Sequence, residues 1–348
     1  MIRQLSVGLG GLDCEVRVFV PSWNPVPVEV NVSGIDVIRS KMHFEVASCG
    51  FALGSLPEFK RQVAWADVIH YHFPWPFADI LDLVAGVDKP KVVTYHSDIV
   101  RQKSLSSLYG PLMNRFLSRA DFVVATSEQY AKSSPILNKL NNVEVVPIGI
   151  DEKSYPNPSS LVQESVRTQY GQGYFFFVGM LRYYKGLHIL LEACEKQDFR
   201  VVIAGVGPEQ DNLRAMARRK KLRYVEFVGK VSDEEKIALI DNALAMVFPS
   251  HLRSEAFGVS LLEGLMRGKP LITAEVGTGT SFVNKDKETG FIAKAADPVT
   301  LRLAMEHMAE GSTAARLGIQ GRERFERLFT AQQMSQGYKK LYDRVSVG

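Results

Sequence analysis

The sequence of 348 residues has few cysteines and no long apolar run. Its three cysteines, Cys14, Cys49 and Cys194, lie far apart and form no CxxC pair, which favours buried thiols over a disulfide framework or a metal site. No stretch of 18 apolar residues could span a membrane, and the first residues lack the apolar core of a signal peptide. We therefore predict a cytoplasmic protein, which could still bind to a membrane surface.

The sequence also lacks a strong charge of either sign. Its formal net charge is +4, from 42 basic and 38 acidic residues. The first 150 residues contain 14 of each, so the whole excess lies in the second half. A nucleic-acid-binding protein would show a basic stripe with interleaved aromatic residues, so we predict no nucleic-acid partner. A basic second half is typical of a domain that holds an anionic ligand.

Short β-branched runs alternate with helical patterns along most of the chain. The predicted strands are EVRVFV, DVIHYHF, KVVTYH, DFVVATS and VEVVPIG in the first half, and YFFFVG, RVVIAG, VEFVG, AMVFPS and PLITAE in the second. Apolar strands joined by helices indicate parallel sheets covered on both faces. We predict an α/β protein with two Rossmann-like, doubly wound domains at 1–150 and 151–330, joined by a linker near 149–160. Residues 331–348 should form a helix that could pack back on the first domain.

The start of the first domain departs from this pattern. A doubly wound domain normally opens with a strand and a glycine-rich turn. Residues 1–9 instead have the pattern of an amphipathic helix, with Ile2, Leu5 and Leu9 on one face. We expect the first strand of this sheet to be absent, and the natural protein to begin about twenty residues upstream of Met1, enough for a strand and a glycine-rich turn.

Two glutamates stand in an apolar stretch, SEAFGVSLLEG, after the predicted strand AMVFPS. Phe257, Gly258 and Val259 begin a helix there, and its free N–H groups and positive dipole end suit an anion that Gly258 allows to approach closely. Glu263, farther along the helix, could accept hydrogen bonds from a ribose diol. Glu255, ahead of the anion site, could hold hydroxyls of the group that a diphosphate carries. The alternative is that Glu263 only partners the helix dipole.

A second anion-binding pattern is FVGMLRYYKG, which ends a strand with Gly179 and places Arg182 and Lys185 in the next turn. Two cations at the carboxyl end of a strand suit a diphosphate, although a solvated surface loop would look the same. No D-x-D sequence occurs, so we predict no metal cofactor for the diphosphate. Cations and a helix terminus can neutralise it.

Together these motifs resemble the retaining glycosyltransferases of family 4, which have the GT-B architecture of two Rossmann-like domains facing a cleft. SEAFGVSLLEG matches the family's Glu-x7-Glu signature, VPIGID its linker, VGMLRYYKG its diphosphate-binding turn and GVGPE its glycine turn. The resemblance covers nearly the whole chain. It implies that Glu255 contacts the donor sugar, Glu263 the ribose, and Lys185 with a nearby arginine the diphosphate.

One position departs from the family pattern. Family members commonly have an arginine directly after the glycine that matches Gly179, where this chain has Met180. Arg182 is the candidate to take over that role.

The first domain contributes residues on the side of the transferred sugar and the acceptor. His96 stands at a strand end in VVTYHSDIVRQK, and the resemblance implies that it faces the transferred sugar; the alternative is a structural histidine. Asp98 could orient His96 or contact the acceptor. His72, in YHFPWPF, resembles part of an acceptor-side wall.

The predicted nucleotide is GDP. Guanine offers N–H donors beside an O6 acceptor, so a protein site that recognises guanine needs a carboxylate and a cation close together. Asp233 and Lys236 in KVSDEEK supply such a pair, although Ser232 followed by acidic residues also fits simple helix capping. The spacing resembles that of GDP-mannose-dependent family members.

Residues 99–119 contain Arg101, Lys103, Arg115 and Arg119 and no acid after residue 98, along with several leucines. A basic amphipathic helix can lie on an anionic bilayer, and a core helix with a solvated face is the alternative. The family's use of lipid-linked acceptors favours the membrane.

The resemblance therefore implies a retaining hexosyltransferase with His96 and Glu255 as catalytic residues and no cofactor. It would move α-mannose, or a related GDP-deoxyhexose such as D-rhamnose, from a GDP-sugar to a lipid-linked glycan in bacterial O-antigen assembly. We expect it at the inner face of the cytoplasmic membrane. Two alternatives stay open: a GT-B sugar-nucleotide epimerase, and a scaffold without activity because the first glycine loop is missing.

Overall fold

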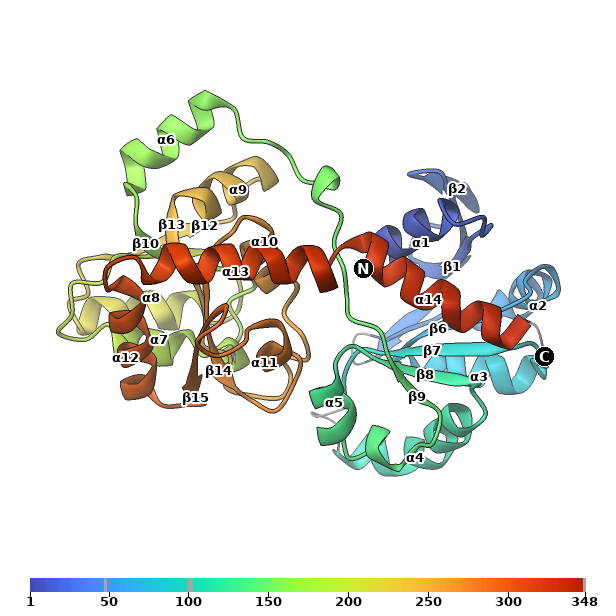
Figure 1. Ribbon diagram of the computed structural model, residues 1–348. Coiled ribbons are helices and arrows are strands. Elements are labelled where there is room, and N and C mark those ends of the chain that lie inside the picture. The colour runs from blue at the N-terminus through green and yellow to red at the C-terminus, as the bar shows by residue number, and fades with distance from the viewer. Residues whose placement is uncertain (47–48, 99–102, 347–348) are drawn as a thin grey trace. The chain divides into compact units, whose positions relative to one another are not determined.

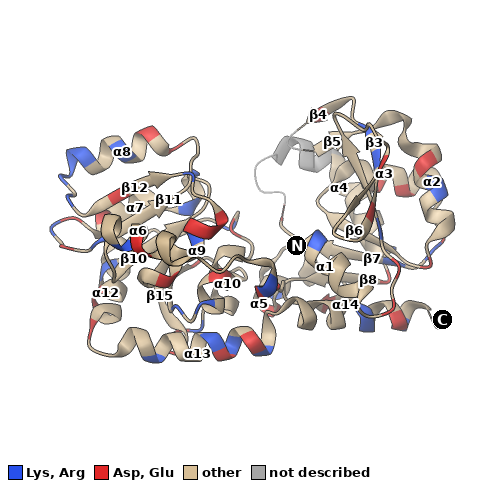
Figure 2. Cartoon of the chain, turned by 90° about the horizontal axis from the view of Figure 1, so that it is seen from above, with Lys and Arg blue, Asp and Glu red and all other residues tan. Residues whose placement is uncertain are grey.

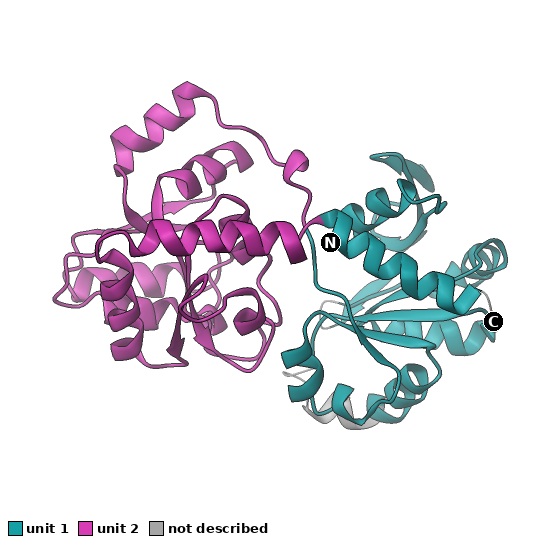
Figure 3. Cartoon of the chain, in the orientation of Figure 1, with its two compact units in different colours: residues 1–149, 331–348 teal, residues 150–330 magenta. Residues whose placement is uncertain are grey.

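The computed structural model describes residues 1–46, 49–98 and 103–346, apart from the side chains of 103–108. The chain forms two compact units: unit 1 contains residues 1–149 and 331–348, and unit 2 contains residues 150–330 (Figure 3). Both units have parallel strands flanked by helices (Figure 1). The predicted α/β class with two Rossmann-like domains is confirmed. No helix in the described ranges is both long and apolar enough to cross a bilayer.

Unit 1 is built from the first half of the chain and the last helix. Its elements are α1 (Ile2–Gly10), β1 (Arg17–Ser22), β2 (Glu29–Val32), β3 (Ile35–Lys41), β4 (Phe44–Val46), β5 (Cys49–Phe51), η1 (Leu53–Ser55), α2 (Leu56–Trp65), β6 (Ile69–Phe73), α3 (Pro76–Ala85), β7 (Lys91–Tyr95), α4 (Lys103–Ser118), β8 (Phe122–Ala125), α5 (Glu128–Ser133), η2 (Leu137–Lys139), β9 (Val143–Val145) and α14 (Ala331–Ser346).

The strands of unit 1 form separate sheets. Strands β6, β7, β8 and β9 pair in chain order and in parallel, and β7 is buried along its whole length. Strand β1 pairs in parallel with β3 in another sheet, to which β2 adds antiparallel, and every residue of β1 is only half-buried. Among the described strands, none pairs with the outer edge of β1 or of β6. The expected incomplete first sheet is therefore observed in the described residues.

Helix α14 returns to unit 1 and lies along α1 (Figure 1). A Cβ atom at Gly8 would be 2.0 Å from Oγ of Ser335, so the two helices approach too closely there for any side chain on α1. On the strand side, the hydroxyl of Tyr338 is 2.6 Å from Oγ1 of Thr94 on β7. The last helix is thus part of the core of unit 1.

Unit 2 contains one large sheet with helices on both sides. Its elements are η3 (Glu152–Ser154), α6 (Ser160–Tyr170), β10 (Tyr174–Val178), η4 (Tyr183–Lys185), α7 (Leu187–Ala193), β11 (Val201–Ala204), α8 (Gln210–Arg219), β12 (Val225–Gly229), α9 (Asp233–Asn242), β13 (Ala243–Phe248), α10 (Val259–Met266), β14 (Leu271–Glu275), α11 (Thr280–Val283), β15 (Gly290–Lys294), α12 (Pro298–Ala309) and α13 (Thr313–Leu328).

The six strands of this sheet are parallel, in the order β12-β11-β10-β13-β14-β15. Strand β11 is buried along its whole length. Strand β14 is buried at all but one position, as are β10 and β13, which form the centre. The strand order reverses between β10 and β13. In such sheets, ligands bind outside the carboxyl ends of the strands at the reversal point. The segments that follow β10 and β13 are therefore where a site is expected.

Candidate functional site

The turn after β10 is held against the end of β13 by a glycine. Gly186 has a φ of +70°, and a Cβ atom there would lie 1.9 Å from the carbonyl oxygen of Pro249. Glycine is the residue that tolerates both the left-handed conformation and this backbone contact. The contact brings η4 beside the loop that follows β13, and Lys185 at the end of η4 reaches Glu255 in that loop.

Glu255 is a buried carboxylate with one occupied oxygen. Glu255 is 7% exposed. Its Oε2 accepts a hydrogen bond from Nζ of Lys185 and another, of 2.9 Å, from Oγ of Ser250. The hydroxyl of Thr278 donates to the backbone oxygen of Glu255 at 2.6 Å and fixes the loop. Within the described part of the chain, Oε1 of Glu255 has no hydrogen-bond partner. This oxygen is therefore available to accept from a hydroxyl group of a ligand.

Glu263 is the second buried carboxylate, also 7% exposed, and it too is paired with a lysine. Nζ of Lys236 donates to Oε1 of Glu263 at 2.9 Å and lies 3.0 Å from Oδ1 of Asp233. It is also 5.3 Å from the ring centroid of Tyr155. Burial lowers the pKa of Lys236, but the carboxylates of Glu263 and Asp233 raise it by more, so the lysine stays charged. Because each buried carboxylate has its own lysine, neither is an unpaired buried charge.

The start of α10 forms a backbone anion site next to Glu255. Gly258 is the N-cap residue with a φ of +84°, and no side chain in the described residues caps this helix end. The first N–H groups of a helix without such a cap are left for water or a ligand. The ring of Phe257 is buried and packs edge-on against Phe329, with 6.2 Å between the centroids, which fixes the loop before the helix. A Cβ atom on Gly258 would be 3.9 Å from Oε1 of Glu255, so the carboxylate adjoins this site.

The predicted diphosphate-binding turn also includes Gly179 and Arg182, and only Gly179 makes a close backbone contact. A Cβ atom on Gly205 would be 1.9 Å from the carbonyl oxygen of Gly179, so the turns after β10 and β11 touch through their backbones. Arg182 is exposed, and its Nε lies 2.9 Å from the sulfur of Met180. Within the described residues its guanidinium makes no ion pair, and the structure does not bring it to the Lys185–Glu255 pair.

Sequence reasoning missed Arg253, which lies in the loop between β13 and α10. Its Nη1 donates to the carbonyl oxygen of Gly277 at 2.9 Å, and this bond ties the loop to the segment after β14. The sequence could have identified Arg253 as a candidate, because it is a cation only two residues before Glu255.

In unit 1, the structure brings His72 and His96 together. Nδ1 of His72 and Nε2 of His96 are hydrogen-bonded at 2.9 Å. The ring of His70 stacks on His72 with 4.6 Å between centroids. Nδ1 of His70 is 2.7 Å from the hydroxyl of Tyr342 on α14. Burial lowers the pKa of His70 to about 3 and, with the N-terminal ammonium group, that of His96 to about 4. The pKa of His72 is also lowered well below its usual value, mainly by burial, so the three rings are neutral at pH 7.

Among the described residues, no hydrogen bond is found between Asp98 and His96, and the role of Asp98 in orienting this ring stays a prediction. Oδ1 of Asp98 accepts from the hydroxyls of Tyr95 at 3.1 Å and Ser134 at 2.6 Å, whereas the bonded ring nitrogen of His96 is held by His72. The carboxylate therefore links the end of β7 to the segment after α5. Contact with an acceptor stays a prediction.

The predicted basic amphipathic helix corresponds to α4. Arg101 and the side chains of 103–108 lie outside the described residues. In the rest of the helix and just beyond it, the buried side chains are Met113, Phe116 and Leu117, and the exposed cations are Arg115 and Arg119. This part of α4 is arranged as a core helix with a solvated face, which was the alternative to a membrane-binding helix. Contact of α4 with a membrane stays a prediction.

Both halves of the chain are similar to known proteins. Residues 162–324 match the family model described as Glycosyl transferases group 1, and residues 1–154 match the one described as Glycosyltransferase Family 4. D-rhamnosyltransferase WbpZ of Pseudomonas aeruginosa is 45% identical over 333 residues, which are 95% of this chain and 87% of that protein. This chain belongs to glycosyltransferase family 4.

A second relative of this family 4 glycosyltransferase is O-antigen chain mannosyltransferase C of Escherichia coli, 44% identical over 346 residues, 98% of this chain and 92% of that protein. Among solved structures, sucrose-phosphate synthase from Thermosynechococcus elongatus superposes with a TM-score of 0.81 at 22% identity, covering 99% of this chain and 93% of that one. HepE from Anabaena in complex with UDP-glucose superposes with a TM-score of 0.75 at 17% identity, covering 98% and 95%. These likenesses confirm the predicted GT-B fold, and the family confirms a glycosyltransferase.

Proposed function

We propose that this glycosyltransferase moves α-mannose or D-rhamnose from a GDP-sugar to a lipid-linked glycan in the assembly of O-antigen, with retention of the anomeric configuration. The choice of sugar is supported by the two relatives, one named a D-rhamnosyltransferase and the other an O-antigen chain mannosyltransferase. The two names differ in the sugar, so the proposal keeps both. A peripheral location at the inner face of the cytoplasmic membrane belongs to the same proposal.

The observation that carries the proposal is the arrangement of Glu255, which has one oxygen fixed by Lys185 and Ser250 and the other open beside the start of α10. A donor whose diphosphate lies on Lys185 and the α10 amides would have its sugar within reach of Oε1 of Glu255. Lys236 holds Glu263 in place to accept from the ribose hydroxyls. This order of groups, ribose, diphosphate and sugar, is the order in a nucleotide sugar.

Guanine recognition is assigned to Asp233 and Lys236. The alternative, that these residues only cap α9, is weakened because the cap is complete without them: Oγ of Ser232 accepts from the N–H of Glu235 at 3.2 Å, and the Glu235 carboxylate accepts from the N–H of Ser232 at 2.8 Å. Asp233 has a side chain that is 78% exposed next to the Lys236 cation. An exposed carboxylate beside a cation is what the Watson–Crick edge of guanine requires.

The proposed transfer breaks the bond between the sugar C1 and the diphosphate oxygen and forms a bond from C1 to an acceptor hydroxyl on the same face of the sugar. The acceptor proton passes to the departing phosphate oxygen. Lys185 and the α10 amides would stabilise the charge that develops on the phosphate. His96 would contact the sugar from unit 1, and no metal is assigned a part because the sequence offers no D-x-D motif.

A donor screen tests this function. We expect GDP-mannose or GDP-D-rhamnose to raise the melting temperature of the protein, and UDP-sugars and ADP-sugars to raise it much less. The sugar should then be transferred to a lipid-linked glycan extracted from an O-antigen-producing strain. Equal stabilisation by UDP-sugars would overturn the nucleotide assignment. Conversion of the sugar nucleotide without an acceptor would indicate an epimerase, and GDP binding without any transfer would indicate a scaffold.

A further inference from the structure

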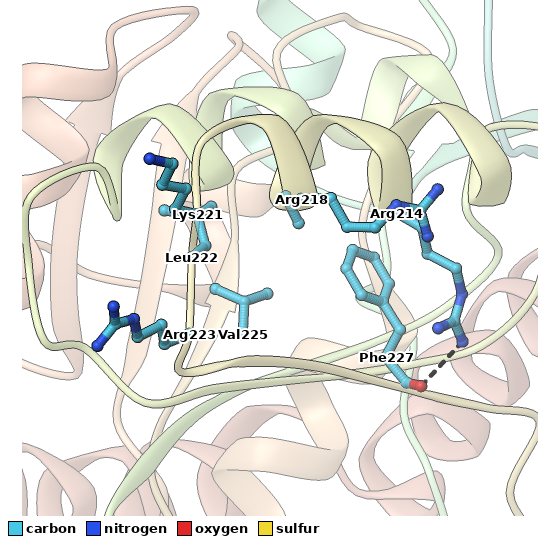
Figure 4. Close-up of a pocket in the computed structure, with 8 residues that line it drawn as sticks. Arg214, Arg218, Lys221, Leu222, Arg223, Val225 and Phe227 are labelled. Carbon is cyan, nitrogen blue, oxygen red and sulfur yellow. Dashed lines mark hydrogen bonds between the residues drawn. The ribbon is translucent and has the colours of Figure 1, made fainter.

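A groove outside the candidate donor site runs between α8 and the edge strand β12, with a volume of about 320 Å³ (Figure 4). Its rim carries four basic residues, Arg214, Arg218, Lys221 and Arg223. The groove lies along α8 and extends to the amino-terminal start of β12, whereas the donor-side residues follow the carboxyl ends of the strands. It is therefore a separate surface of unit 2, to which the proposed function assigns no role.

The charge of this surface is concentrated and unbalanced. Residues 212–225 contain six basic residues and no acidic one. Figure 2 shows these basic residues on α8 and the segment after it. Arg218, Lys221 and Arg223 are exposed, and across the described residues none of them forms an ion pair. Their neighbour Lys220, by contrast, pairs with Glu195 at 2.7 Å.

The floor of the groove is apolar. It is formed by Leu222, Val225 and Phe227, each of them half-buried. Figure 4 shows Lys221 and Arg223 at one end of the groove, with Val225 and Phe227 between them and Arg214. With cations at both ends and apolar residues between them, the pattern fits several anionic groups above an apolar layer.

The free edge of β12 is not open to an added strand. Val201 of β11 bonds to Tyr224, so the carbonyl oxygen of Phe227 points to the outer edge. Nη2 of Arg214 donates to this oxygen at 2.9 Å (Figure 4), and its guanidinium carbon lies 5.2 Å from the Phe227 ring centroid. An acidic peptide that pairs with the edge would have to displace Arg214. This arrangement favours a lipid surface over a peptide strand.

We propose that this basic groove docks unit 2 on an anionic lipid bilayer. The rim cations bind lipid phosphates, and the apolar floor faces the glycerol and acyl region between them. Such binding combines buried apolar area with attraction to anionic lipids, the two contributions that hold peripheral proteins on membranes. The inference does not depend on which sugar is transferred, and its test does not require transferase activity.

The test is co-sedimentation of the 348-residue protein with vesicles of phosphatidylethanolamine containing about one third phosphatidylglycerol, compared with pure phosphatidylcholine. The groove variant combines Arg218→Gln, Lys221→Gln and Arg223→Gln. We expect its partition coefficient on the anionic vesicles to fall roughly 100-fold, because each basic side chain near an anionic surface contributes about a factor of five.

A control variant removes the same charge from other surfaces of unit 2, near the opposite edge of the sheet and on α13. It combines Lys287→Gln, Lys294→Gln and Arg316→Gln, three exposed residues that form no ion pair within the described chain. We expect it to bind anionic vesicles within about three-fold of the unchanged protein, since only long-range attraction is lost. Both variants should melt at the temperature of the unchanged protein.

The proposal fails if the groove variant binds anionic vesicles as well as the unchanged protein, or if the control loses as much binding. It also fails if the unchanged protein binds phosphatidylcholine equally, since the cations would then have no role. Groove-dependent binding of polyglutamate without any vesicle binding would assign the surface to an acidic protein partner and overturn the lipid assignment.

Discussion

Glu255 combines two properties that rarely occur in one side chain: it is buried, and one of its oxygens is free within the described structure. The lysine and serine on Oε2 offset the cost of burying the charge, which would otherwise amount to several kcal/mol. They also fix the direction of Oε1. A carboxylate held in this way can orient a sugar without moving when the sugar binds.

We expect Glu255→Ala to lose nearly all transfer while GDP binds at least as tightly as before. The carboxylate should touch the sugar and not the nucleotide, and its removal frees Lys185 for the diphosphate. Isothermal titration with GDP and a transfer assay would separate the two effects. Ser250→Ala keeps the carboxylate and its lysine and removes only one hydrogen bond to Oε2, so it should lose less transfer than Glu255→Ala. Loss of GDP affinity in Glu255→Ala would contradict the assignment.

Lys185→Ala should instead weaken the binding of GDP by about 1.5–3 kcal/mol, the usual contribution of a charged hydrogen bond.

The sequence indicated the chemistry of individual residues but not their partners. The Glu-x7-Glu pattern pointed to Glu255 and Glu263, yet Lys185 is 70 residues before the first of them, and only the strand order brings it near. Asp98 shows the opposite case. Its position two residues after His96 suggested a partnership, but β7 ends at Tyr95 and residue 98 lies beyond the strand. Tyr95 and Ser134 hold it instead.

At the scale of elements, the most deeply buried parallel strands were predicted, whereas the antiparallel strands and the partly exposed parallel strands β3 and β15 were not. Strands such as β7 and β11 are short, continuous apolar runs, which the pattern identifies well. The hairpin of β2 and β3 was missed, although its turn has the sequence Ser33-Gly34 with positive φ at both residues. Strand β2 is mostly exposed and polar, so it has no apolar face to reveal it.

The turn η4 offers a test of how one backbone contact shapes the site. We expect Gly186→Ala to lower the free energy of unfolding by roughly 2–4 kcal/mol, because its Cβ would collide with the Pro249 carbonyl and its φ is left-handed. GDP binding should weaken with it, since Lys185 would shift. Chemical denaturation and GDP titration measure both effects.

The matched control for this turn is Gly173→Ala, in the same unit. Gly173 has a φ of +76° but no atom within 4 Å of its added Cβ, so only the strain of the left-handed conformation applies. It should lose about 1 kcal/mol and leave GDP binding unchanged. If the two variants lose the same stability, the contact with Pro249 is not what holds the turn.

For the whole molecule, the sequence indicated the sign of the charge excess and the half of the chain that carries it, but not the surface on which it lies. The excess of basic residues in the second half suggested an anionic ligand, which Lys185 and Lys236 partly explain. Both of these lysines are, however, paired with glutamates. The unpaired cations of unit 2 include those of the basic groove, on a surface that the strand order separates from the donor side. A net charge counts residues and carries no information on where the fold puts them.

The last helix connects the two ends of the sequence within unit 1, and this can be tested by removing it. Helix α14 buries Met334, Tyr338 and Leu341 and covers buried residues of α1. We expect a chain that ends at Thr330 to lose the cooperative melting of unit 1, because α1 and β7 would lose the side chains that cover them. Unit 2 should keep its own transition in calorimetry and its affinity for GDP, since every donor-side residue lies between residues 150 and 330. Transfer should be absent.

The control for this truncation is Lys339→Ala, which removes only a surface ion pair with Asp343 and should change the free energy of unfolding by no more than about 0.5 kcal/mol. If the shortened chain still transfers sugar, α14 is not required for the structure of unit 1, and the hydrogen bonds of Tyr338 and Tyr342 to β7 and β6 are incidental.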